Sequence, residues 1–408
     1  MNLAEKVALK NVWIVSAIVV LYGLGNGLLL IATPQAGLSL QLGSDHIGMI
    51  AAGLPIGYAI SCLLCGRLFR AVPGKYVLMG GLLGGALSML GMSQARTAWG
   101  CVASQLGFGL ASGAFWPFAS AWLLDFETPS ISRARLLRHY NVGWTSGTAA
   151  GMLIAGWICR KGYIFETILA GGAVIASIFF LAMVPPANPP LRNARGADGV
   201  PHSALHITKM LLLAAVLANL SALGTRTLIL NTYAELNKAY DFGAERMGYF
   251  AAAPLIAQLV TFSAGSLYER WLGMRRVYVL MAVALVAINL IFAWERSFPV
   301  LLGAVILHGV VLALAFQSGM LAATSFFSSP RAGTTFHETV IGMAGTAPLA
   351  AGMLVNDLKG RGYETIEALQ APFLFMSGAA VIYLVAQMIL ISGASERALL
   401  SGKAGVAK

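Results

Sequence analysis

The chain contains few charged residues and no common enzyme motif. Only 11% of its 408 residues are Asp, Glu, Lys or Arg, whereas about 25% is usual in a soluble domain. It holds no phosphate-binding loop, no nucleophile elbow and no His-Glu-x-x-His metal motif. These absences exclude a soluble fold for the whole chain and argue against an enzyme or an ATP-driven pump. We therefore expect no catalytic residue, no metal ligand and no cofactor.

Cysteine is also scarce. The four cysteines, which all lie in apolar stretches, are Cys62, Cys65, Cys101 and Cys159. The spacing of Cys62 and Cys65 suits a metal, but the pair lacks polar neighbours and a second cluster, so we interpret it as membrane packing. The formal net charge is +11, yet the cations form no stripe interleaved with aromatic residues. We expect no nucleic-acid partner.

Long apolar runs are what the chain has instead. Hydrophobic residues make up 58% of it, and runs of about 20 residues, the length that crosses a bilayer, recur from residue 11 to residue 392. We predict an all-α polytopic membrane protein with twelve transmembrane helices, at residues 11–33, 45–66, 75–93, 97–123, 138–159, 163–184, 208–231, 246–268, 276–294, 298–325, 335–357 and 370–392. The first run is too long for a cleavable signal, and we expect it to remain as an anchor.

A polar, proline-rich stretch after Pro185 separates the sixth span from the seventh. We predict an N-terminal six-helix half (1–184), a linker (185–206), a C-terminal six-helix half (207–392) and a tail (393–408). Eighteen Lys and Arg residues lie on the side of the N-terminus, eight lie on the other side, and Arg226 lies within a span. The positive-inside rule places the linker and both termini in the cytoplasm, with the chain in a bacterial inner membrane.

The two halves repeat one another. Five stretches recur at offsets of 198 to 200 residues, among them Gly162-Tyr163 against Gly362-Tyr363 and His139 against His337. Such agreement indicates two pseudo-symmetric six-helix repeats in parallel orientation, which is a known transporter plan.

A short basic turn also occurs twice, as Gly66-Arg67-Leu68-Phe69-Arg70 and as Gly265-Ser266-Leu267-Tyr268-Glu269-Arg270. Together with the two six-span halves and the linker, it resembles the loop motif of the major facilitator superfamily. The resemblance implies gating roles for Gly66, Arg70, Asp125, Gly265, Glu269 and Arg270. The family's fifth-position acid, which faces a helix N-terminus of the other half, is present as Glu269, but Arg70 replaces it in the first copy. Asp125 could pair with Arg67 or Arg70, or it could be a solvated surface residue.

The same resemblance implies a substrate site near the midplane, lined by spans 1, 4, 7 and 10 with contributions from spans 2, 5, 8 and 11. Polar side chains within spans are costly in lipid and should face such a cavity. Arg226 has Asn26 as its counterpart at offset 200; Tyr22 shares a helical face with Asn26, and Asn219 shares one with Arg226. We predict that these four residues bind substrate. Snorkelling to the membrane surface is the alternative for Arg226.

Four further residues are candidates for the same site. Tyr58 and Gln258 are related by an offset of 200, Trp116 offers a flat face to an apolar substrate body, and His308 could carry a proton. Each has a plain alternative: hydrogen bonding between helices for Tyr58, Gln258 and His308, and packing for Trp116.

None of the sixteen acidic residues falls near the middle of a predicted span, and Glu338 is placed at the cytoplasmic start of span 11. A buried Arg226 would then be neutralised by a substrate anion. We predict a secondary transporter, monomeric in lipid, that moves a small organic solute by alternating access. The favoured solute is an anion with apolar bulk.

Two other functions stay open. A proton-coupled drug exporter has the same fold, but it is expected to carry a carboxylate deep in the early spans, where this chain has Asn26. A transporter-like membrane sensor would need a long cytoplasmic region, and the linker and tail leave little room for one. H⁺ is a candidate coupling ion through His308, whereas facilitated diffusion and anion exchange need no coupling ion.

Overall fold

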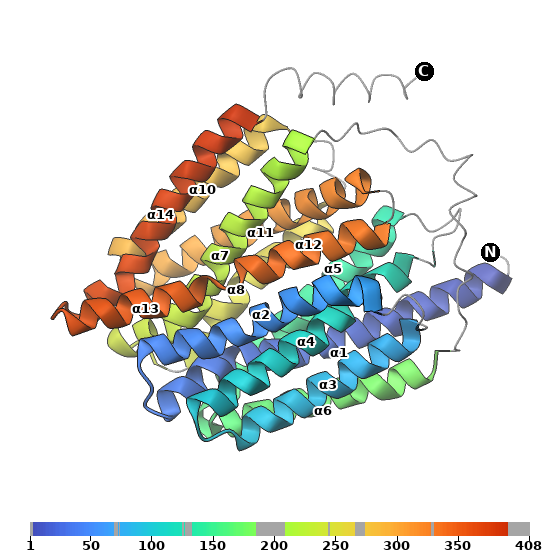
Figure 1. The fold of residues 1–408 in the computed structure, drawn as a ribbon, viewed down its shortest axis with the longest axis horizontal. Coiled ribbons are helices and arrows are strands. Elements are labelled where there is room, and N and C mark those ends of the chain that lie inside the picture. The colour runs from blue at the N-terminus through green and yellow to red at the C-terminus, as the bar shows by residue number, and fades with distance from the viewer. Residues whose placement is uncertain are drawn as a thin grey trace.

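A computed structural model describes residues 3–68, 72, 74–124, 126, 133–184, 209–243, 245–265, 274–327 and 330–390 of the chain. All regular elements within these ranges are helices, and Figure 1 shows them as one elongated bundle. The linker predicted at 185–206 and the tail predicted at 393–408 lie outside the described residues, so the domain boundaries stay predictions.

The N-terminal half consists of six long helices, drawn from blue to green in the lower part of Figure 1: α1 (Leu3–Ser39), α2 (Ser44–Leu68), α3 (Gly74–Gln94), α4 (Ala98–Leu124), α5 (Arg133–Ile158) and α6 (Tyr163–Ala182). A short 3₁₀ turn, Cys159–Lys161, joins the last two. The most extensive packing is of α2 on α4 and of α1 on α5. A Cβ atom on Gly147 or Gly151 would collide with the backbone of α1, so these glycines allow α1 and α5 to approach closely.

The C-terminal half repeats this plan with one break. Its helices are α7 (Lys209–Ala239), α8 (Glu245–Ser263), α10 (Arg275–Trp294), α11 (Phe298–Phe326), α12 (Pro330–Ala344), α13 (Ala347–Gly360) and α14 (Thr365–Leu390). The helices α12 and α13 together form one span, interrupted by a turn at Gly345 and Thr346. Pro348, in the first turn of α13, has no backbone N–H to donate, which suits a helix start.

The predicted fold class is confirmed. Each predicted span falls on a described helix, with α12 and α13 sharing the eleventh. Within the described residues, nine spans are long and apolar enough by composition to cross a membrane. The boundaries differ in two places that matter for the site. Helix α7 continues to Ala239, eight residues beyond the predicted end, and α12 begins at Pro330, five residues before the predicted start.

The two halves meet along two seams, α5 against α8 and α2 against α12 and α13. Glycines face one another in both: Gly156 lies against Gly248, and Gly48 lies against Gly352. On the outside, large apolar side chains such as Trp157 and Ile389 are more than 70% exposed. A surface of this kind is stable in contact with lipid tails rather than with water.

Candidate substrate site in the central cavity

A cavity of about 170 Å³ lies between the two halves. At about 10–15 Å³ for each water, it has room for roughly ten water molecules, or for one small organic solute. Its walls come from α1, α2, α4, α5, α7, α8, α11 and α12, which are the eight spans that the resemblance implies. The polar and aromatic side chains in the lining are Asn26, Thr33, Tyr58, Gln105, Ser112, Trp116, Tyr140, Trp144, Arg226, Thr227, Asn231, Gln258, Phe316 and Glu338.

Five of the eight predicted binding residues line this cavity, namely Asn26, Tyr58, Trp116, Arg226 and Gln258. The other three lie behind its wall. Tyr22 is fully buried and its hydroxyl is 2.8 Å from the Ser112 hydroxyl. Asn219 donates to the carbonyl oxygen of Ala315 at 2.7 Å, and His308 Nε2 lies 2.9 Å from the carbonyl oxygen of Ala222. Both contacts join α7 to α11.

Arg226 has no hydrogen-bond or ion-pair partner among the described residues, although it lies well inside α7. Neighbouring Asn231 on the same helix donates to the Thr227 carbonyl oxygen and leaves its own amide oxygen available. A guanidinium that lines a cavity without an ion-pair partner is costly, because no direct contact with a protein anion offsets its lost hydration. The site therefore suits a ligand that supplies negative charge.

Aromatic rings also line the cavity. Trp116 packs edge-on against Tyr22, with 5.1 Å between ring centroids, and Trp144 packs on Phe316 of the other half at 5.6 Å. Trp116 thus packs against other rings and also lines the cavity. These rings would contact an apolar substrate body.

Glu338 is the one acidic side chain in the described lining, and sequence reasoning missed it. It is 3% exposed and lies about two turns inside α12 rather than at the first residues of that helix. The sequence places Glu338 at the cytoplasmic start of span 11, where binding is not expected, whereas the structure places it in the cavity lining, because α12 begins eight residues earlier at Pro330. One sequence signal was present: at the offset of 198 that relates His337 to His139, the counterpart of Glu338 is Tyr140, which also lines the cavity.

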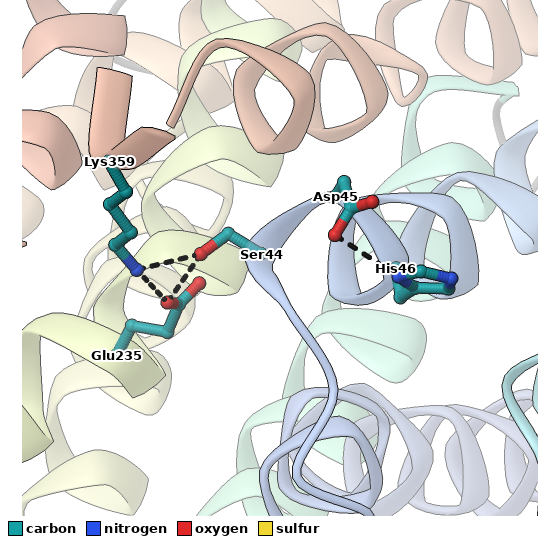
Figure 2. A network of polar contacts seen from close by, with 5 residues as sticks. All are labelled: Ser44, Asp45, His46, Glu235 and Lys359. Carbon is teal, nitrogen blue, oxygen red and sulfur yellow. Dashed lines mark hydrogen bonds and ion pairs between the residues drawn. The ribbon is translucent and has the colours of Figure 1, made fainter. Parts of the chain in front are cut away.

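A second polar cluster joins the two halves at the end of the bundle that the charge distribution predicts to be periplasmic. Figure 2 shows the Ser44 hydroxyl of α2 donating to Glu235 of α7 at 2.7 Å. Lys359 of α13 pairs with the same Glu235 oxygen at 3.1 Å and donates to Ser44 at 3.0 Å. Nearby, Asp45 and His46 pair with one another at 3.1 Å, within α2 alone.

The predicted gating residues are mostly beyond what the structure describes. Gly66 belongs to the last turns of α2, and Gly265 is buried just after α8. Arg70, Asp125, Glu269 and Arg270 lie outside the described residues, so their gating roles stay predictions. Within the described ranges, no three His, Cys, Asp or Glu side chains are grouped as a metal site would require.

Two pseudo-symmetric helical halves around a central cavity define a membrane transport protein. The chain belongs to the Major Facilitator Superfamily, whose family model matches residues 15–354. No curated protein sequence matches it significantly.

Solved structures share the fold at low sequence identity. The nucleoside transporter NupG superposes with a TM-score of 0.71 at 15% identity, covering 96% of this chain and 99% of its own. An inward-facing bacterial homologue of the human lysosomal transporter Spinster gives 0.68 at 14%, covering 98% and 99%. The human organic anion transporter MFSD10 gives 0.62 at 17%, covering 95% and 100%. These likenesses concern the fold.

Proposed function

We propose that this transporter carries a small organic anion with apolar bulk across a bacterial inner membrane by alternating access, with both termini in the cytoplasm. The observation that carries the proposal is Arg226, a cation of the cavity lining that has no hydrogen-bond or ion-pair partner among the described residues, because the one carboxylate of the described lining, Glu338, bonds to Tyr58 instead. An anionic group on the substrate would supply the missing counter-charge, and the rings of Trp116 and Trp144 would contact its apolar part.

The volume of the cavity and the description of one structural neighbour both support such a substrate. A cavity of about 170 Å³ is smaller than a typical ligand pocket of about 300–1,000 Å³, so it suits a small molecule such as an aromatic monocarboxylate. One structural neighbour is described as an organic anion transporter, so this fold can accommodate that class of substrate.

The test is a thermal-shift screen of the purified full chain in detergent, because a ligand that prefers the folded state raises the apparent melting temperature. The probes are benzoate and hexanoate, the uncharged benzamide as a matched neutral molecule, and a set of lipophilic cations. We expect stabilisation by the anions but not by benzamide. Arg226→Ala should remove it, and Arg226→Lys should retain part of it, because the positive charge remains without the planar two-point geometry.

One observation favours a second candidate, the cation or drug exporter: Glu338 places a carboxylate in the same cavity. The anion transporter is preferred because Glu338 already has a donor in Tyr58, whereas Arg226 has no partner among the described residues. Stabilisation by the lipophilic cations alone, unaffected by Arg226→Ala, would overturn the anion proposal and support the exporter.

A further inference from the structure

We propose that Glu338 and Tyr58 form a proton-binding site in the cavity, and that one proton on Glu338 accompanies each monoanion bound at Arg226. The transporter would then be an electroneutral proton–anion symporter. This inference rests on the proposed function and names the coupling ion of the same site.

The carboxyl group of Glu338 is held by a single hydrogen bond. Tyr58 Oη donates to Oε2 at 2.6 Å, whereas Oε1 is buried and has no hydrogen-bond partner among the described residues. A buried oxygen of this kind loses its hydration without compensation while the group is ionised. A proton from cavity water that adds to Oε1 would remove that charge and leave the Tyr58 bond to Oε2 intact.

The groups that face Glu338 supply no positive charge in direct contact. The titratable side chains from its neighbouring helices are Tyr58 and Cys62 of α2 and Tyr140 of α5. On α12 itself, His337 is 2% exposed and packs edge-on against Phe316 of α11, 4.8 Å between ring centroids. The α4, α8 and α11 residues in the cavity lining include no ionisable side chain. Arg226 of α7 lines the same cavity as Glu338 without forming an ion pair with it among the described contacts.

Charge balance then couples the proton to the anion. Arg226 and Glu338 are the charged side chains of the described lining, and together they are neutral while Glu338 is ionised. A monoanion entering this state would leave one uncompensated negative charge in a poorly solvated cavity, which is costly. A proton on Glu338 leaves Arg226 alone to face the anion and restores neutrality. Because linkage is reciprocal, each of the two ligands raises the affinity for the other.

The site also lies on the seam between the halves. Tyr58 belongs to α2 of the N-terminal half and Glu338 to α12 of the C-terminal half, so their hydrogen bond crosses the interface. Alternating access separates or restores contacts between halves. Movement of α2 relative to α12 would therefore change the surroundings of the carboxyl group in the same step that opens the cavity.

The first arm of the test reads the proton directly and needs no substrate. Infrared spectra of the reconstituted full chain are recorded from neutral to mildly acidic pH. We expect the carbonyl stretch of a protonated carboxylic acid to grow as pH falls in the wild type and in His337→Gln. In Glu338→Gln, the part of this band that comes from Glu338 should be missing. If Glu338→Gln shows the same pH-dependent band as the wild type, the carboxyl group of Glu338 is not the proton site.

The second arm measures linkage with benzoate as the probe. Binding to the wild type should tighten by up to about tenfold for each unit of decreasing pH, the limit for uptake of one proton. Glu338→Gln, which has almost the same shape and can still accept from Tyr58, should bind benzoate with little pH dependence. His337→Gln should keep the wild-type slope.

The outcomes separate this inference from the proposed function. Benzoate binding that depends on Arg226 but not on pH would overturn the coupling and leave the anion transporter standing. Absence of binding by benzoate and hexanoate even at acidic pH would overturn both. If Glu338→Gln fails to fold, the pH dependence of benzoate affinity in the wild type still tests the inference, because an affinity that does not change with pH excludes coupling to a proton.

Discussion

Tyr22 shows how a side chain on the expected helical face can still lie outside the cavity. It shares a face of α1 with Asn26, but it is fully buried, with its ring stacked on Phe115 at 4.0 Å between centroids. Its hydroxyl pairs with that of Ser112, which does line the cavity. Helical periodicity predicts the direction of a side chain, but the neighbouring helix decides whether that direction ends in a space or in packed atoms.

Tyr22→Phe tests this placement. It removes one hydrogen bond between side chains and leaves the aromatic packing in place. We expect a loss of about 1 kcal/mol of stability or less, because water in the cavity can still reach Ser112. Stabilisation by benzoate in a thermal-shift measurement should remain. Loss of benzoate binding without loss of stability would show that Tyr22 contacts the substrate.

Residues could be predicted where the repeat gave independent support. Asn26 and Arg226 were expected in one cavity because they occupy equivalent positions in the two halves, and both line it. Glu338 was placed at the cytoplasmic surface instead, because the polar composition of the first turns of α12 outweighed the signal from the repeat. Gln105, which donates to Thr33 at 2.7 Å, gives no sequence signal of its own.

At the scale of helices, α1 and α5 form a pair whose spacing depends on glycine. A Cβ on Gly151 would collide with the carbonyl oxygen of Leu24, whereas one on Gly172 of α6 has no heavy atom within 4 Å. The sequence predicts both helices, but it does not show which of its 46 glycines face a backbone.

Gly151→Val should therefore destabilise the protein, because the two helices must separate to accommodate the branched side chain. Overpacking of this kind costs about 1–3 kcal/mol. The matched control is Gly172→Ala, which should be neutral or stabilising by up to about 1 kcal/mol, since it removes a helix-interior glycine without a clash. Melting temperatures in one detergent would compare the two, and equal values would rule out close packing at Gly151 as a requirement of the fold.

The break between α12 and α13 is a feature of an element that sequence patterns did not reveal. One apolar run was expected through residues 335–357, and the structure interrupts it at Gly345, where a Cβ would collide with the ring of Pro55 on α2. The turn thus lies where the two halves touch. Pro348 is a local reason for the break, because it cannot donate to the carbonyl oxygen of Ala344, and the contact with Pro55 adds a tertiary one that composition within a single span does not report.

At the scale of the whole molecule, the repeat predicts the two halves, but contacts between them depend on residues far apart in the chain. Ser44, Glu235 and Lys359 come from three helices, and no local motif links them. The ion pair of Glu235 and Lys359 lies wholly within the C-terminal half, and the hydroxyl of Ser44 connects it to the N-terminal half (Figure 2).

Ser44→Ala should therefore weaken closure at this end while leaving the ion pair in place. The hydroxyl is 2.7 Å from Glu235 and 3.0 Å from Lys359. A hydrogen bond to a charged group contributes about 1.5–3 kcal/mol to stability. A shift of about 1.4 kcal/mol changes the ratio of open to closed molecules tenfold.

Spin labels on exposed positions of α2 and α13 would report the distance between the two halves, and we expect a larger population of long distances in Ser44→Ala. His46→Ala is the matched control, because its contact with Asp45 does not cross between halves. Equal distance distributions in Ser44→Ala and wild type would show that the glycine contacts of Gly48 with Gly352 hold this end without the hydroxyl.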